Sequence, residues 1–303
     1  MERGTFKSSN GKTSIHYYIS APQNPRAIVQ FMHGMAEHSE RYVLFANFLN
    51  NHGIAFCIAD HLGHGKSIND QTELGYFGKN GWKHMVHDAA TLTKIIKNKY
   101  PQIPFIAAGH SMGSFVCRAY SAIYPKNADA CMFIGTGCAP KTVGMGKFAA
   151  SFISFFKGEK YRSKLLDNLA FGSFNKKIPN SKSASDWLSR NEKNVQAYTD
   201  DELCGFVFTC DGFYNLFSLF EYVSSDKWAE NLNKKTPVLL LAGKDDPVGH
   251  YGKDIVRISQ ELTNAGVKNV TEKLFENDRH EILNETDKED VFAYILDWIE
   301  NVI

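Results

Sequence analysis

One serine in this sequence stands in a pattern suited to nucleophilic chemistry. Ser111 follows the apolar run 105–108 and precedes a helical stretch, 112–124. A G-x-S-x-G pattern between a strand and a helix is typical of a sharp turn that exposes the serine hydroxyl. Glycines suit both flanks because side chains would collide in so tight a turn. We therefore interpret Ser111 as a nucleophile rather than an ordinary turn serine. The pattern consists of Gly109, His110, Ser111, Met112 and Gly113.

His280 is the candidate base for this serine. A serine hydroxyl is a weak nucleophile near neutral pH and needs a base beside it. With this kind of turn, the expected chain order is serine, acid and then histidine. His280 is the only histidine in the last fifty residues, and it follows the last apolar run, 270–275. We expect it to act as the base rather than to be exposed to solvent.

Two adjacent carboxylates compete for the role of the acid that orients the histidine. Asp245 and Asp246 directly follow the apolar run 238–242. Only one of them can point toward His280, because neighbouring side chains in an extended segment face opposite ways. We choose Asp246 as the acid that stabilises the charged imidazole. Asp245 is then expected to bond the local backbone of the turn.

The negative oxygen formed after attack needs preorganised hydrogen-bond donors. One donor is expected to be the backbone N–H of Met112. The second should come from the loop after the apolar run 27–32, where Gly34 lets the backbone turn and Met35 supplies its N–H. For the His33 side chain we prefer a hydrogen bond that braces this loop over a direct chemical role.

The remaining pattern predicts the elements that position these residues. A hairpin is expected around Asn10-Gly11, between strands at 5–7 and 15–18. Continuous apolar runs alternate with helical stretches after it, which favours a mostly parallel sheet buried on both faces and flanked by helices, an α/β fold. The runs are 27–32, 54–59, 105–108, 130–134, 238–242 and 270–275, and the helical stretches are 39–50, 81–100, 112–124, 252–264 and 287–302.

The segment 139–225 interrupts this alternation. It contains 16 Phe, Tyr or Trp among 87 residues, against 23 among the other 216, so it is not a solvated linker. We interpret it as a mainly helical lid inserted into a catalytic core formed by residues 1–138 and 226–303. The alternative is a second small core without a ligand role.

Four sequence blocks resemble the monoacylglycerol lipase and lysophospholipase branch of the α/β-hydrolases, which is often grouped with S33 serine aminopeptidases. They span nearly the whole core. The blocks are 33–42 (HGMAEHSERY), 60–67 (DHLGHGKS), 109–113 (GHSMG) and 243–248 (GKDDPV). The segments 169–175, 186–190 and 203–209 also resemble lids of bacterial proteins in this branch. This resemblance implies a subfamily more firmly than a substrate.

The resemblance also implies roles for two of the candidate residues. In this family the acid stands three residues after the glycine that ends its strand, which maps to Asp246. The second oxyanion donor follows the His-Gly pair, which maps to Met35. Small residues are commoner at that position, so Met35 is expected to crowd the acyl pocket.

The leading hypothesis is hydrolysis of carboxylic esters with a single medium or long acyl chain, in a tunnel walled by lid aromatics. An aminopeptidase or amidase acting on small N-terminal residues is the alternative, and it needs lid carboxylates to hold an amine. A non-catalytic binding protein is the third possibility. The first choices for inward-facing rings are Phe152, Phe156, Phe213 and Phe217, and the available lid carboxylates are Asp200, Asp201, Glu202 and Glu221.

Composition limits the other possibilities. With 43% apolar and 22% charged residues and a net charge of +1, nothing favours a nucleic-acid partner. No apolar signal core begins the sequence, so a cytoplasmic location is expected. The six cysteines lack zinc spacing, and neither a metal nor another cofactor is expected. The oligomeric state stays open, because the aromatic lid could be buried in a dimer or touch a membrane surface.

Overall fold

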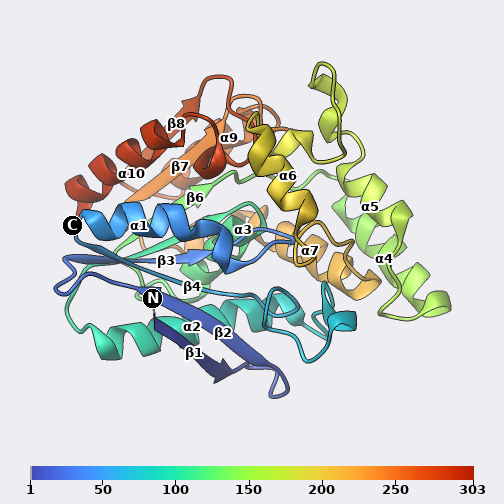
Figure 1. The fold of residues 1–303 in the computed structure, drawn as a ribbon, viewed down its shortest axis with the longest axis horizontal. Helices are drawn as coiled ribbons and strands as arrows, with labels where there is room; N and C mark the ends of the chain where they lie inside the picture. The colour runs from blue at the N-terminus through green and yellow to red at the C-terminus, as the bar shows by residue number, and fades with distance from the viewer. Residues whose placement is uncertain (1) are drawn as a thin grey trace.

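The computed structural model describes residues 2–303, so Met1 of the predicted core lies outside the described residues. Eight strands form one sheet in the order β1-β2-β4-β3-β5-β6-β7-β8 (Figure 1). The strands from β4 to β8 in this order are parallel, and β1 and β2 are antiparallel. Their bounds are β1 Glu2–Lys7, β2 Ser14–Ser20, β3 Ala27–Met32, β4 Ile54–Ala59, β5 Phe105–His110, β6 Ala130–Ile134, β7 Val238–Gly243 and β8 Val270–Phe275.

The sheet confirms the predicted α/β fold. The hairpin is present, with Thr5 opposite His16. All six apolar runs are strands, and β5 continues two residues beyond its predicted end, up to the nucleophile turn. Every residue of β3, β5, β6 and β7 is buried, as continuous apolar runs predict for strands covered on both faces.

Helices cover both faces of the sheet. One face carries α1 and α10, and their apolar residues share a core cluster with alternate residues of the central strands. The other face carries α2, α3, α8 and α9. Within residues 2–303, no helix combines the length and apolarity needed to cross a membrane. The bounds are α1 Val43–Asn51, α2 Gly81–Lys99, α3 Met112–Ile123, α8 Asp226–Asn231, α9 Lys253–Asn264 and α10 Lys288–Val302.

Two helical predictions need correction. The stretch 39–50 begins as a 3₁₀ helix over Ser39–Tyr42 and becomes α1 only at Val43. The short helix α8 was not predicted, because six residues are too few to show a helical period. The other long helices match their predicted stretches within one residue at each end.

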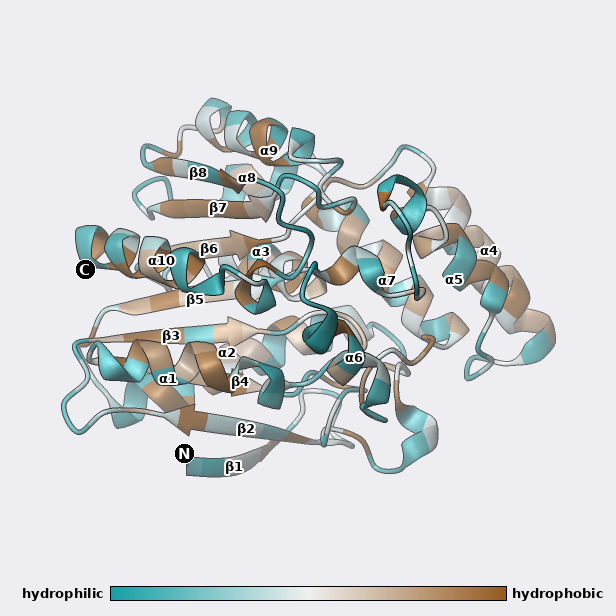
Figure 2. Ribbon diagram, turned by 45° about the horizontal axis from the view of Figure 1, so that its top comes forward, coloured by the Kyte–Doolittle hydropathy of each residue, from teal (hydrophilic) through white to brown (hydrophobic). Residues whose placement is uncertain are grey.

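Residues 139–225 lie between β6 and α8 and are mainly helical. Figure 2 shows α4, α5, α6 and α7 gathered beyond the carboxyl ends of the parallel strands. The only strand-like pairing described in this segment is an isolated bridge between Arg162 and Thr209. The bounds are α4 Val143–Lys157, α5 Lys164–Phe171, α6 Glu192–Asp200 and α7 Cys210–Val223, with 3₁₀ turns at Phe174–Lys177 and Asp186–Leu188.

Arg118 of α3 connects the two ends of this segment. Its buried guanidinium donates hydrogen bonds to the carbonyl oxygens of Gly137 and Val223, which stand just before and near the end of the segment. The guanidinium also lies 4.2 Å from the centre of the Trp228 ring. Charged groups are buried only where hydrogen bonds satisfy them, so these contacts fix the entry and exit of the segment beside α3.

Gly113 provides a test of how tightly α3 lies against the sheet. A Cβ at this position would stand 2.0 Å from the carbonyl oxygen of Met32 at the end of β3. We expect Gly113→Ala to lower the free energy of unfolding by about 2–3 kcal/mol or more, since overpacking shifts backbone atoms. Gly144→Ala is the matched control, because a Cβ there meets nothing within 4 Å. The control should gain up to about 1 kcal/mol from helix propensity. Equal urea midpoints for the two variants would contradict this packing.

Candidate active site

Ser111 occupies the turn between β5 and α3 in a strained conformation. Its backbone has φ 55° and ψ −124°, a region that non-glycine residues rarely adopt. Such strain costs about 1–3 kcal/mol and persists only where the surroundings impose it. Here the Ser111 N–H donates to the carbonyl oxygen of Ile134 at 2.9 Å. A Cβ at Gly109 would lie 2.2 Å from the carbonyl oxygen of Gly113, so the turn requires the glycine.

His280 and Asp246 form a buried pair. His280 Nδ1 lies 2.9 Å from Asp246 Oδ2, and the two side chains are 1% and 0% exposed. A carboxylate only accepts hydrogen bonds, so Nδ1 carries the proton and Nε2 is the basic nitrogen. The other carboxylate oxygen of Asp246 accepts a hydrogen bond from the backbone N–H of Val248 at 2.8 Å. Asp245 is exposed, and its backbone N–H donates to the carbonyl oxygen of Asp278 at 2.9 Å, whereas its carboxylate forms no hydrogen bond with the described residues.

The Nε2 atom of His280 is buried and has no hydrogen-bond partner among the described residues. Ser111 Oγ therefore forms no hydrogen bond with His280 Nε2. Such catalytic hydrogen bonds are often long or poorly aligned until substrate binds. Gly135, after β6, gives the imidazole room, because a Cβ there would stand 3.1 Å from His280 Cε1. Trp187 covers the other side, with ring centres 5.0 Å apart.

Two backbone N–H groups near the serine have no acceptor within residues 2–303. Neither the Met35 nor the Met112 N–H donates a hydrogen bond to any described residue. The loop that carries Met35 lies close to the nucleophile, since a Cβ at Gly34 would be 3.3 Å from Ser111 Cβ. Unsatisfied donors beside a nucleophile are what stabilisation of an oxyanion requires.

The His33 side chain braces the same loop. It is completely buried, its Nδ1 lies 2.8 Å from the carbonyl oxygen of Gly34, and its Nε2 accepts a hydrogen bond from the His61 N–H at 2.9 Å. Burial, followed by the nearby His64, lowers the pKa of His33 to about 3. The ring is therefore neutral at physiological pH, and it joins the loop after β3 to the loop after β4.

A family model described as "Serine aminopeptidase, S33" matches residues 23–287, which is most of the chain. The chain belongs to the S33 family. A solved structure of a thermostable carboxyl esterase from Bacillus coagulans in complex with glycerol superposes on this S33 member with a TM-score of 0.93 and 29% identity, covering 99% of this chain and 98% of the other. The predicted α/β-hydrolase fold is thereby confirmed.

Named relatives of this S33 protein include lipases. It is 30% identical over 200 residues to a monoacylglycerol lipase from Mycolicibacterium smegmatis, covering 64% of this chain and 62% of the relative. The match thus spans less than two thirds of that relative's length. A monoglyceride lipase homolog from Monkeypox virus is 26% identical over 280 residues, covering 91% of this chain and 90% of the relative. These similarities confirm the predicted monoacylglycerol lipase branch.

The four aromatic residues chosen for the acyl pocket of this S33 member lie in different environments. Phe213 of α7 is completely buried, and Phe217 is half-buried against Gly146 of α4. Phe152 and Phe156 are 55% and 65% exposed on α4. Neither of these last two rings is enclosed in this structure, and their role in an acyl pocket stays a prediction. The helix α4 carries apolar residues around most of its circumference, so sequence spacing did not show which side faces inward.

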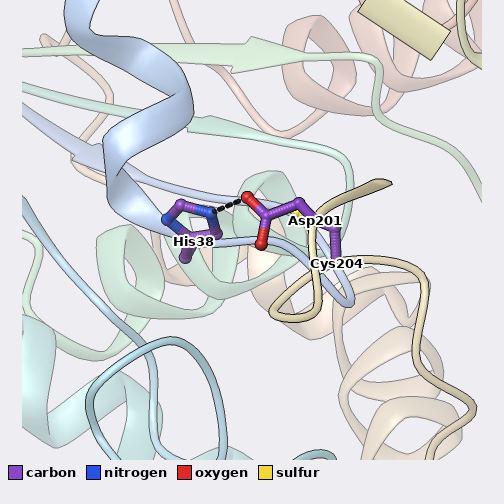
Figure 3. A group of neighbouring side chains, drawn as sticks. All are labelled: His38, Asp201 and Cys204. Atoms are coloured by element: carbon purple, nitrogen blue, oxygen red, sulfur yellow. Dashed lines mark hydrogen bonds and ion pairs between the residues drawn. The ribbon is translucent and has the colours of Figure 1, made fainter. Parts of the chain in front are cut away.

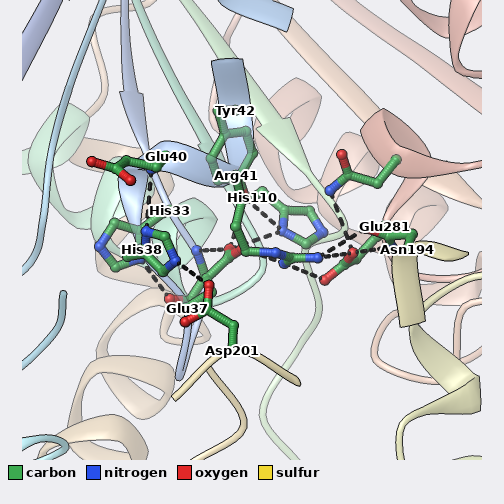
Figure 4. A network of polar contacts seen from close by, with 12 residues as sticks. His33, Glu37, His38, Glu40, Arg41, Tyr42, His110, Asn194, Asp201 and Glu281 are labelled. Carbon is green, nitrogen blue, oxygen red and sulfur yellow. Dashed lines mark hydrogen bonds and ion pairs between the residues drawn. The ribbon is translucent and has the colours of Figure 1, made fainter. Parts of the chain in front are cut away.

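Several residues at this site were not singled out from the sequence. Trp187 lies against His280, and Glu37, Arg41 and Glu281 form a buried ion network behind it (Figure 4). Glu37 and Arg41 belong to the block 33–42, but nothing in the sequence shows that they contact Glu281. Glu37 and Arg41 stand close in sequence to His33, and Glu281 directly follows His280. This closeness was the available indication that they belong to the site.

Two groups of side chains have the composition of metal ligands within the described residues. His38, Asp201 and Cys204 form the first (Figure 3). The Nδ1 atom of His38 accepts from the Glu40 N–H at 3.3 Å, so its Nε2 carries a proton and donates to Asp201 at 2.8 Å. This hydrogen bond joins the loop after β3 to the segment 139–225.

The second group combines three carboxylates with an internal cation. Asp278, Glu285 and Asp287 all form ion pairs with Arg190. Burial and then the two neighbouring carboxylates raise the pKa of Asp278 to about 7. The guanidinium already supplies the positive charge that a metal would bring to these carboxylates.

We expect Ser111→Ala to lower the turnover rate on the order of a million-fold, because a hydroxyl positioned beside a base is lost. The variant should also no longer be labelled by a fluorophosphonate probe. Ser114→Ala is the control, because its hydroxyl donates to the Ser111 carbonyl oxygen and is buried. Full labelling of Ser111→Ala would show that another residue is the nucleophile.

The two neighbouring aspartates give a second prediction. Asp246→Asn should reduce kcat by about ten thousand-fold, because an amide favours the wrong imidazole tautomer. Asp245→Asn should change kcat by only a few fold, since this side chain is exposed. Steady-state kinetics of both variants distinguish the two carboxylates. The opposite ranking would assign the acid to Asp245.

Proposed function

We propose that this protein is a serine hydrolase that cleaves carboxylic esters of a single acyl chain, such as monoacylglycerols or lysophospholipids. The observation that carries the proposal is the buried His280–Asp246 pair. The Nε2 atom of His280 is free and lies in the same site as the strained Ser111 turn. The similarity to monoacylglycerol lipases and to a carboxyl esterase supports this substrate class.

The proposed reaction begins with attack by Ser111 Oγ on the ester carbonyl carbon while His280 Nε2 takes the hydroxyl proton. Asp246 stabilises the imidazolium that forms. The carbonyl oxygen becomes an oxyanion, for which the N–H groups of Met35 and Met112 are the proposed donors. Removing one such donor typically costs about 3–4 kcal/mol of transition-state stabilisation.

The second half of the reaction releases both products. The tetrahedral intermediate collapses, the C–O bond to the alcohol breaks, and His280 returns the proton to the departing oxygen. The acyl group stays on Ser111 as an ester. Water then attacks this acyl-enzyme while His280 again acts as base, and the carboxylic acid leaves with Ser111 restored.

We propose that residues 139–225 form the lid and that its exposed apolar face contacts a membrane surface transiently. Apolar residues more than half exposed cluster on α4 and α5, beyond the carboxyl ends of the strands (Figure 2). Exposed apolar patches commonly mark interaction sites. A single-chain lipid could enter the site from such a surface. The exposed residues are Met145, Phe148, Phe152, Phe155, Phe156, Leu165 and Leu169.

The alternative, an aminopeptidase, is favoured by the description of the matching family model. It requires a carboxylate that can bind a substrate amine. Asp201 is hydrogen-bonded to His38, and Glu221 forms an ion pair with Lys147 at 2.5 Å. Glu202 is exposed, and Asp200 accepts a hydrogen bond from Gln196. The partners of Asp201, Glu221 and Asp200 and the exposure of Glu202 weigh against an amine site and in favour of the esterase.

A series of 4-nitrophenyl esters from acetate to palmitate, run beside aminoacyl anilides, tests the proposal. Each methylene buried by the enzyme contributes about 0.8 kcal/mol, so octanoate should exceed butyrate in kcat/KM by about a hundred-fold. Phe217→Ala should reduce this ratio without changing acetate hydrolysis, because acetate has no chain to bury. Tyr214→Ala is the control, since this ring lies on the same helix as Phe217 and is 41% exposed. Faster cleavage of anilides than of every ester would contradict the proposal.

A further inference from the structure

His110 precedes the nucleophile and lies at the centre of a buried polar network (Figure 4). Its Nε2 lies 3.1 Å from the carbonyl oxygen of His280. Its Nδ1 lies 3.2 Å from the Tyr42 hydroxyl and 3.7 Å from Glu37 Oε1. The ring therefore stands between the loop that carries the base and the loop that follows β3.

The hydrogen-bond directions around His110 identify its protonation state. A carbonyl oxygen can only accept, so the Nε2 atom facing His280 must carry a proton. The Tyr42 hydroxyl donates to Glu37 Oε1 at 2.7 Å, which leaves its oxygen as an acceptor for His110. The Nδ1 atom facing this oxygen must then carry a proton too. An imidazole with protons on both nitrogens is positively charged.

The surrounding charges favour the same state. Glu37 and Glu281 are two buried carboxylates that share a single guanidinium, Arg41, at 2.6 and 2.7 Å. Burial opposes their ionisation, but Arg41 together with the His110 ring outweighs it and holds the pKa of both carboxyls below the usual value. Two negative charges and one positive charge leave the group one positive charge short of neutrality. An imidazolium at His110 supplies it.

The network connects the loop after β3, the loop that carries His280, and α6. Glu37 accepts a hydrogen bond from the N–H of Gly34 in the loop that carries Met35. Glu281 is adjacent to the base and bonds Arg41 through both carboxylate oxygens at 2.7 Å. Asn194 of α6 donates to Glu281 at 2.7 Å and accepts from Arg41 at 3.1 Å. A shift of one charged member therefore displaces the others.

We propose that His110 is a positioning residue, present as an imidazolium at neutral pH, whose charge fixes the base loop and the oxyanion loop around Ser111. Its ring lies 4.6 Å from the ring of His280, and it acts on the site through this contact, the His280 carbonyl, Tyr42 and Glu37. This role in catalysis rests on the proposed function. The charge state does not, because it follows from the contacts of the folded chain alone.

The positive charge of His110 makes this polar network sensitive to alkaline pH. Burial would lower the pKa of His110, but Glu37 and then Glu281 raise it above the ordinary value of 6.5. A group whose folded pKa is raised stabilises the native state fully below its unfolded pKa and loses this contribution as pH rises through the folded value. The titratable groups facing the ring are Glu37, Tyr42, His280 and Glu281.

Nuclear magnetic resonance of the ¹⁵N-histidine-labelled protein tests the charge without using activity. The His110 signal, assigned by its loss in His110→Gln, should show both ring nitrogens protonated at about pH 7 and one at higher pH. His52→Gln is the matched control, because its ring is exposed. A singly protonated His110 at neutral pH would overturn the proposal, whether or not the protein hydrolyses esters.

Kinetics test the positioning role. His110→Gln should lower kcat for an ester on the order of a hundred-fold at neutral pH with little change in KM, since misplacement of reacting groups by about 1 Å has an effect of this size. The ratio of wild-type to variant kcat should fall as pH rises above neutrality, because the wild-type ring then loses its charge. A ratio independent of pH would exclude a role for the charge.

A double-variant cycle separates charge balance from packing. Glu37→Gln combined with His110→Gln removes one charge of each sign and keeps an oxygen for the Gly34 N–H. The free energy of unfolding and kcat of the double variant should be closer to wild type than the sum of the single effects predicts. Additive effects would mean that the two residues act independently and would overturn the coupling.

Discussion

The position of the candidate nucleophile depends on a contact between backbones. Where β5 turns into α3, the helix lies so close to the end of β3 that a Cβ on Gly113 would stand 2.0 Å from the Met32 carbonyl oxygen. This closeness forces the chain to reverse within one residue and imposes φ 55° on Ser111. The same closeness brings the loop after β3, with Gly34 and Met35, next to the serine. Both the nucleophile and its two free N–H groups thus follow from how closely one helix approaches the sheet.

The parts of the molecule that depend on local periodicity could be predicted from the sequence. Continuous apolar runs identified every strand of the parallel sheet, and the G-x-S-x-G pattern located Ser111 at the turn that follows β5. The pairing of His280 with the second of two adjacent aspartates was also expected, and in the structure these side chains are 2.9 Å apart. Their roles in catalysis remain proposals.

Long-range side-chain contacts could not be predicted in this way. Arg41 bonds Glu281 across 240 positions and Asn194 across 153, and neither spacing has a periodic signal. The rings of the segment 139–225 posed a similar difficulty. Phe152 and Phe213 are both phenylalanines within apolar helices, yet the first is 55% exposed and the second completely buried. Which side of a helix faces inward is decided by its neighbours when nearly all sides are apolar.

The hydrogen bonds of Arg118 affect how the segment 139–225 can change in length. Its guanidinium bonds two backbone carbonyls, at Gly137 and Val223, and any residue supplies a carbonyl. These hydrogen bonds hold the ends of the segment 139–225 through backbone atoms, so they do not depend on the side chains at those positions. Once the ends of a loop are fixed together, doubling its length costs only about 0.6 kcal/mol in closure entropy. The length of the segment between these two ends can therefore change at a small cost in closure entropy, whereas its buried residues, such as Phe213, remain tied to the core.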